Sequence, residues 1–207
     1  MKTTIKTKIT TVLTAILFLT AMLPTTTYAT KAYPINIVSL TSFRKISVRG
    51  NVEVTLIQRK DTGISYTEDN LGQVKAILDG QTLRITANGS EMSKIFIYVN
   101  DLYRIEAEDY AIVKTQGKLK IPNLQVFLRD EAQVEINSET SSLYTNISDH
   151  AKLTLSGSTG NHFLITGKAP RLIFENFAAL KTSIELLDSS IMDKKIALNF
   201  RPGKESN

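Results

Sequence analysis

The chain has 207 residues, 42% of them hydrophobic and 22% charged, which is the size and composition of one globular domain. It contains no cysteine, which excludes a disulfide scaffold, a thiol nucleophile and a cysteine-ligated metal site. With only two histidines a histidine-rich metal cluster is disfavoured as well, so we expect neither a metal ion nor a cofactor.

The first 29 residues have the layout of a secretory signal peptide. A basic start with Lys2, Lys6 and Lys8 precedes a mostly apolar stretch at residues 12–23, and small residues around Ala29 offer a cleavage point. A membrane anchor is the alternative, but a helix that spans a bilayer needs about 20 apolar residues. We therefore predict cleavage after Ala29 and export to the periplasm, the cell surface or the medium, with no membrane-spanning segment in the mature chain.

The basic character of the chain belongs mostly to this predicted signal peptide. Residues 1–29 contain three lysines and no acidic residue, so their removal lowers the net charge of +5 by three. A nucleic-acid partner requires a basic surface on the folded domain, and the rest of the sequence shows none. We therefore expect no nucleic-acid partner.

Three segments of the mature chain share one pattern of alternating apolar and polar residues around a central Asp-x-Ala. Their frames are Ile105-x-Ala107-x-Asp109-x-Ala111-x-Val113, Val126-x-Leu128-x-Asp130-x-Ala132-x-Val134 and Ile147-x-Asp149-x-Ala151-x-Leu153-x-Leu155. An earlier segment, from Ile46 to Leu56, has the same shape with Gly50 in place of the aspartate. Alternation is typical of a strand with one buried face, and the Asp-x-Ala indicates a bend between two strands.

The spacing of these segments, about 20 residues, predicts the fold. One such segment, here called a rung, cannot bury its apolar side alone, whereas rungs stacked on one another enclose a continuous core. We therefore expect an all-β parallel β-helix over residues 33–190, with very little helix, followed by a tail at residues 191–207. A β-sandwich is the alternative. Stacking in phase would place Glu108 beside Arg129 and Lys114 beside Glu135, two pairs of opposite charge.

The pattern also resembles a known family. The opening Phe43-x-x-Ile46-x-Val48-x-Gly50, the Leu83-x-Ile85 after Asp79-Gly80 and the Ile97-x-Val99 before Leu102-x-x-Ile105 are similar to landmarks of the putative auto-transporter adhesin, head GIN domain family. The resemblance covers roughly residues 35–190. It implies a secreted, right-handed β-helix-like solenoid with a proposed role in adhesion, and it carries over no catalytic residues.

Asp109, Asp130 and Asp149 are the most suggestive set of polar residues. Stacked rungs would align them at one corner, where carboxylates can ligate a calcium ion or divide acid and base roles between them. The alternative, which we favour, is that each carboxylate points inward and accepts backbone N–H bonds at its own turn. His150 is expected on an outward polar row beside Tyr110 and Glu131.

His162 falls at the end of a Ser/Gly-rich stretch, residues 156–161, in which Ser156-Gly157 is interpreted as a turn. No partner for its imidazole is evident from the sequence. We therefore assign it no role.

Tyr110, Phe127 and Tyr144 are aromatic residues at positions that the pattern assigns to the outer surface. Exposed rings on a flat β-surface suit stacking on sugar rings or on another protein, so these three form the candidate binding site. The alternative is that loops such as residues 63–72 fold over them.

The sequence contains none of the common hydrolase, protease or nucleotide-binding motifs. We therefore predict an exported, non-catalytic, adhesin-like module that binds a glycan or a cell-envelope protein. A degenerate β-helix enzyme acting on acidic polysaccharide is the alternative, and a purely structural envelope component is a third possibility.

Overall fold

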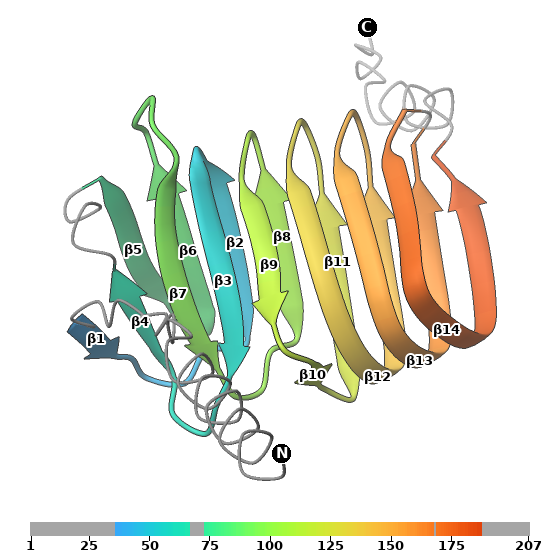
Figure 1. Cartoon of the computed structure of the whole chain (residues 1–207), viewed down its shortest axis with the longest axis horizontal. Helices are drawn as coiled ribbons and strands as arrows, with labels where there is room; N and C mark the ends of the chain where they lie inside the picture. Colours follow the sequence, from blue (N-terminus) through green and yellow to red (C-terminus); the bar gives the residue numbers. More distant parts are fainter. Residues whose placement is uncertain (1–35, 67–72, 168, 188–207) are drawn as a thin grey trace, which may run out of the picture. The chain divides into compact units, whose positions relative to one another are not determined.

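The structure, a computed structural model, describes residues 36–66, 73–167 and 169–187 (Figure 1). These residues form an all-β fold, and among them no helix offers the length and apolar character that a membrane crossing requires. The strands are β1 (Asn36–Ser39), β2 (Lys45–Gly50), β3 (Val52–Gln58), β4 (Gly63–Tyr66), β5 (Val74–Asp79), β6 (Thr82–Ala87), β7 (Ser93–Val99), β8 (Arg104–Glu108), β9 (Ile112–Gln116), β10 (Leu119–Lys120), β11 (Asn123–Leu128), β12 (Gln133–Ile147), β13 (Lys152–Thr166) and β14 (Arg171–Leu186). The predicted signal peptide and tail, residues 1–29 and 191–207, lie outside the described residues.

The strands form two walls that continue into each other. The first wall follows the order β5-β6-β2-β8-β11, and the second follows β1-β4-β7-β3-β9. The long strands β12, β13 and β14 curl from one wall to the other (Figure 1). The N-terminal part of β12 pairs with β9, whereas its C-terminal part pairs with β11. A single strand thus belongs to both walls, and each later rung is one long strand joined to the next by a short corner.

Most of the stack is parallel, but the expectation of a purely parallel β-helix is wrong at the N-terminal end. Strands β1 and β4, β4 and β7, and β5 and β6 pair antiparallel, whereas β2, β3 and the strands from β8 to β14 pair in parallel. The antiparallel strands β4, β1 and β5 fall in a region of the sequence without the Asp-x-Ala frame. They extend the two walls beyond β7 and β6.

Four corners between the walls have a left-handed backbone. Asp109, Asp130 and Asp149 have φ angles of 57°, 60° and 57°, and Gly50, at the corresponding position, has a φ of 88°. Aspartate tolerates this conformation better than most residues because its short side chain bonds locally, and glycine adopts it freely. This backbone conformation explains why three of the segments have aspartate at this position and the fourth has glycine.

The small residue two positions later lies against the core. The backbone N–H of Gln133 donates to the carbonyl of Ala111 (2.9 Å), and that of Lys152 donates to the carbonyl of Ala132 (2.9 Å). Ala111, Ala132 and Ala151 therefore lie on one line down the stack, and all three are fully buried. The predicted vertical alignment of the corners is confirmed.

The charge matching predicted from this register is also present. Arg129 Nη2 lies 2.6 Å from Glu108 Oε2, and Lys114 is the register partner of Glu135. The ion pair of Lys114 is made on the other side, however, with Glu53 on β3 (3.5 Å).

Buried side chains of both walls make one core. Ile46, Ile105 and Val126 contribute from the first wall, and Val113 and Val134 contribute from the second. Burial of a side chain of this size stabilises the fold by about 1.5–3 kcal/mol relative to exposure. Because polar residues occupy the alternate positions, one face of each wall is fixed inside and the other is left free to carry a site.

His162 belongs to this core and not to a loop, because residues 156–161 continue β13 without a turn. Its side chain is 2% exposed, and Nε2 lies 2.9 Å from the hydroxyl oxygen of Thr145. The rings of Phe174 and Phe177 pack edge-on against it, with centroids 6.1 and 5.4 Å away. This burial lowers the pKa of His162 below the usual 6.5.

The first prediction concerns Gly50. A Cβ at this position would overlap the carbonyl oxygen of Ala87, whereas Gly80, which also has a positive φ, faces open space. We expect Gly50→Ala to lower the free energy of unfolding by about 3 kcal/mol or more, and Gly80→Ala by about 1 kcal/mol. Urea unfolding measures both, and equal losses in the two variants would contradict the close approach at Gly50.

The second prediction follows from the lowered pKa of His162. The unfolded chain binds the proton more readily than the folded chain, so the free energy of unfolding should decrease as the pH falls through about 6.5 toward the lower folded pKa. Stability is fully retained above that window. His162→Gln should flatten this part of the pH dependence, as measured by urea unfolding at about pH 7.5 and about pH 5.5. Asn161→Gln, which changes an exposed amide on the same strand and no titratable group, is the control and should leave the pH dependence unchanged.

Candidate functional site

The outer face of the first wall carries the candidate site. Side chains at alternate positions of β8, β11 and the end of β12 point outward, because their neighbours in sequence are buried in the core. The pairing register sets Gln125 beside Arg104 and Tyr144, and Phe127 beside Glu106 and Asn146. Residues about 20 positions apart in the sequence therefore become neighbours on one surface.

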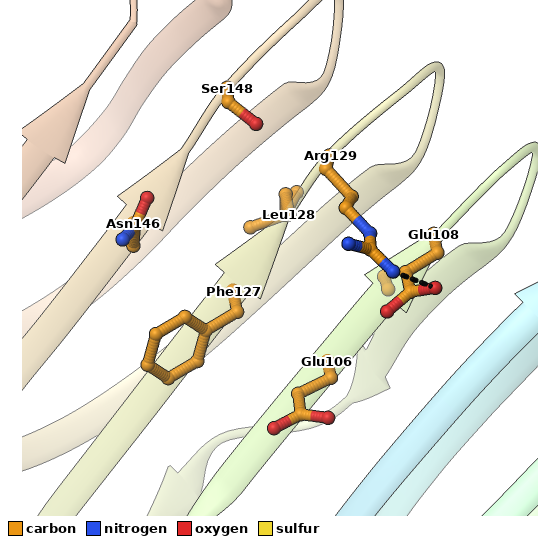
Figure 2. Close-up of a pocket in the computed structure, with 8 residues that line it drawn as sticks. Glu106, Glu108, Phe127, Leu128, Arg129, Asn146 and Ser148 are labelled. Carbon is orange, nitrogen blue, oxygen red and sulfur yellow. Dashed lines mark ion pairs between the residues drawn. The ribbon is translucent and has the colours of Figure 1, made fainter. Parts of the chain in front are cut away.

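A pocket of about 240 Å³, here called the wall groove, opens on this surface (Figure 2). It is lined by Glu106, Ala107, Glu108, Phe127, Leu128, Arg129, Asn146 and Ser148. Three successive rungs contribute to it. Its lining combines one aromatic ring with two carboxylates, a guanidinium, an amide and a hydroxyl.

Arg104 holds one side of the wall groove in place. Its guanidinium lies 4.7 Å from the centre of the Phe127 ring, a cation–π contact, and Nη1 lies 3.2 Å from Glu106 Oε1. Its Nε donates to Gln125 Oε1 (2.9 Å), and Gln125 Nε2 donates in turn to the hydroxyl of Tyr103 (2.6 Å). The face of Phe127 that receives Arg104 is therefore fixed by a hydrogen-bonded network spanning two rungs.

Arg129 and Glu108 form the opposite side. Their short ion pair, marked in Figure 2, raises the pKa of Arg129 through the hydrogen bond that Glu108 accepts. Glu108 also lies 3.9 Å from Arg49 on β2. The carboxylate of Glu108 thus interacts with charges on both neighbouring rungs. Each arginine in contact with the groove also has a glutamate partner, Glu106 for Arg104 and Glu108 for Arg129.

Two of the three predicted aromatic residues come together here. The rings of Phe127 and Tyr144 are tilted by 43° with centroids 5.4 Å apart, and both residues are half-buried on the outer surface. Phe163, the register partner of Tyr144, extends this aromatic row and is 48% exposed. Phe163 was not among the aromatic residues predicted from the sequence, although its place one rung after Tyr144 is a signal that identifies it.

Tyr110 lies elsewhere. It follows the corner residue Asp109, is 65% exposed, and borders a separate hollow of about 630 Å³ together with Met92 and Glu131. The three aromatic residues therefore do not form one surface. Residues 63–66 of the loop that could have covered them form β4 on the second wall, and residues 67–72 lie outside the described ranges.

The corner aspartates form a chain of hydrogen bonds, but they do not point inward as expected. Asp130 and Asp149 are exposed, and Asp109 is partly exposed. The N–H of Asp109 donates to Oδ2 of Asp130 (3.1 Å), and the N–H of Asp130 donates to Oδ2 of Asp149 (3.2 Å). The carboxylates of Asp130 and Asp149 therefore each bind the backbone of the preceding corner and not their own turn, whereas the carboxylate of Asp109 binds the side chain of Arg49.

This row of hydrogen bonds ends at Asp149 on one side and at Arg49 on the other. The hydroxyl of Ser148 donates to Asp149 Oδ2 (2.9 Å), and Arg49 Nε lies 3.0 Å from Asp109 Oδ2. The backbone bond from Asp130 is the main cause that lowers the pKa of Asp149. In the described ranges no three acidic or histidine side chains converge as metal ligands do. His150 is exposed, with Nδ1 3.6 Å from Glu131 Oε1.

The third prediction concerns Asp130, whose side chain bonds one corner while its own backbone adopts a left-handed conformation. Asp130→Ala should lower the free energy of unfolding by about 2 kcal/mol, because it loses a hydrogen bond and the residue type that tolerates this backbone. Asp130→Asn retains both properties in part and should cost less than about 1 kcal/mol. Equal losses in urea unfolding would contradict the structural role of the side chain.

Comparisons with known proteins agree with this architecture. A putative lipid binding protein from Parabacteroides distasonis ATCC 8503 superimposes with a TM-score of 0.56 at 10% sequence identity, over 73% of this chain and 77% of that one. A putative adhesin from the same organism gives a TM-score of 0.55 at 12% identity, over the same shares of the two chains. At such identities the similarity concerns the fold alone. No curated protein matches the sequence.

A family model matches the sequence itself over most of the chain. The family model described as putative auto-transporter adhesin, head GIN domain matches residues 42–187, which span the strands from β2 to β14. The resemblance first seen in the alternating frames is thereby confirmed. The chain belongs to the putative auto-transporter adhesin, head GIN domain family.

Proposed function

We propose that this protein is an exported, non-catalytic binding module that holds a glycan in the wall groove. The observation that carries the proposal is the Phe127 ring, which is fixed beside Tyr144 and set among groups that exchange hydrogen bonds. Sugar rings present C–H faces that stack on aromatic rings and hydroxyls that both donate and accept. The lining of the groove supplies partners for both.

The charges of the wall groove favour a hydroxyl-rich ligand of low charge. Arg104 is paired with Glu106, and Arg129 is paired with Glu108, so neither guanidinium is left to attract a polyanion. Breaking such a pair to bind an acidic sugar would expose a carboxylate to the ligand's own negative charge. This balance supports a neutral glycan over the acidic polysaccharide considered from the sequence.

The corner residue Asp149 is unsuited to the role of a general acid. In glycoside hydrolases a general acid needs a raised pKa, so that it carries a proton near neutral pH. Hydrogen bonds from Asp130 and Ser148 instead lower the pKa of Asp149 and favour its charged form. The proposed role of these carboxylates is to hold the corners.

We also infer the hand in which the parallel part of the stack coils. Residues 104–186 supply successive parallel rungs, and connections between parallel neighbours in one sheet are almost always right-handed. We therefore describe this part as a right-handed parallel β-helix, whose long outer wall is the kind of surface that solenoids use for binding. Family membership supports an exported location, at the cell surface or in the medium.

The fourth prediction tests the wall groove. Phe127→Ala and Tyr144→Ala should each weaken glycan binding by about tenfold or more, because Phe127 lines the groove and Tyr144 packs against its ring. Binding would be surveyed on a glycan array and then measured by calorimetry with the best neutral oligosaccharide. Tyr110→Ala is the matched control, since it removes an exposed aromatic ring from the separate corner hollow.

Retention of binding in Phe127→Ala and Tyr144→Ala would reject the wall groove as the site. Loss of binding in Tyr110→Ala alone would move the site to the corner. Array signals confined to acidic glycans would contradict the argument from the paired arginines.

A further inference from the structure

Within the described residues the stack ends at β14. Among the described strands β14 pairs only with β13, so its other edge carries unpaired backbone groups along its whole length. The side chains that continue the core are also uncovered, since Phe174, Ile184 and Leu186 are 51%, 65% and 72% exposed. A long, unprotected and partly apolar edge strand is a template for pairing with another strand.

On β13, one rung earlier, the side chains at the equivalent positions are buried. Leu155 and Leu164, the register partners of Phe174 and Ile184, are 0% and 2% exposed. The inward residues of β14 are thus of the type that this fold buries, and one further layer would bury them in the same way. Singly exposed apolar residues need no explanation, but a row of them at the end of a core does.

We propose that β14 pairs antiparallel with β14 of a second copy of this chain, across a two-fold axis at Ala178. Ala178 lies near the middle of the strand, so residues 171–185 of one copy face residues 185–171 of the other. An isologous contact of this kind closes on itself and gives a dimer rather than a fibre.

The charges of β14 support this register. The strand carries two basic and two acidic residues, which are Arg171, Lys181, Glu175 and Glu185. Pairing about Ala178 sets Arg171 opposite the second copy's Glu185, and Glu175 opposite the second copy's Lys181. All four charges therefore meet an opposite charge, and the two-fold axis repeats each pair. No other antiparallel register of the strand with itself gives both pairs.

The backbone has the matching pattern. The N–H of Arg171 donates to the carbonyl of Ala151, just before β13, and the N–H of Leu187 donates to the carbonyl of Thr166 in β13. Toward each end of β14 the alternate residues therefore direct their N–H groups to the free edge. In the proposed register two of these free-edge residues, Leu172 and Ile184, face each other, as do Phe174 and Thr182. The free backbone groups of one copy therefore face free backbone groups of the other, and side chains that point into the core of one copy lie beside those that point into the core of the other.

The fifth prediction is a charge-reversal experiment on the purified chain, with dimerisation followed by sedimentation velocity over about a hundredfold range of concentration. Glu175→Lys and Lys181→Glu should each weaken the dimer by about tenfold or more, because symmetry turns both copies of the pair into like-charge contacts. The double variant, with both reversals, should restore the affinity. Lys60→Glu changes the charge equally at an exposed position outside β14 and should have no effect.

Thr182→Pro provides a second test that does not depend on charge. It removes an N–H from the free edge and leaves the bonds to β13 in place, so it should abolish the dimer while the chain stays folded by circular dichroism. A chain that stays monomeric at every concentration overturns the proposal, and so does a dimer that none of these variants affects. A dimer that forms only after removal of residues 188–207 would show that the chain's own continuation covers β14, and it would overturn the proposal too.

Discussion

The in-phase hydrogen bonding of each rung to the next is the constraint on which the other features of this domain depend. It aligns Ala111, Ala132 and Ala151 in the core and sets the corner aspartates within hydrogen-bonding distance of each other. A slip of one residue would turn Phe127 inward and Val126 outward, and it would remove the core and the outer surface together. The corners oppose such a slip, because a left-handed backbone there favours aspartate, asparagine or glycine over other residues.

The wall groove is a product of that stacking and of no single segment. Arg104 acts across one rung boundary on Phe127, and Phe127 acts across the next on Tyr144. Each residue is ordinary in its own strand, and the site exists because three strands present their outward positions side by side. A surface made in this way is rigid, since its side chains stand on hydrogen-bonded strands and several are fixed by neighbouring charges.

Much of this could be predicted from the sequence, because the alternation and the Asp-x-Ala frame report strand faces and rung spacing directly. The antiparallel strands β4, β1 and β5 could not, since they lie where the frame is absent. The inward orientation expected for Asp109, Asp130 and Asp149 was wrong for a physical reason: a residue with positive φ interrupts the alternation from which its direction was inferred. The burial of His162 was missed because Ser156-Gly157 was interpreted as a turn, whereas Gly157 takes a φ of 94° inside a continuous strand.

The nearest-neighbour character of the stack has an evolutionary consequence. Between β8 and β13 each rung contacts only the rung before it and the rung after it. Duplication or deletion of one whole unit would therefore lengthen or shorten the molecule by one strand spacing, about 4.8 Å, and leave the remaining contacts intact. The length of such a domain can be adjusted in fixed increments by gene-level copying, without redesign of any interior.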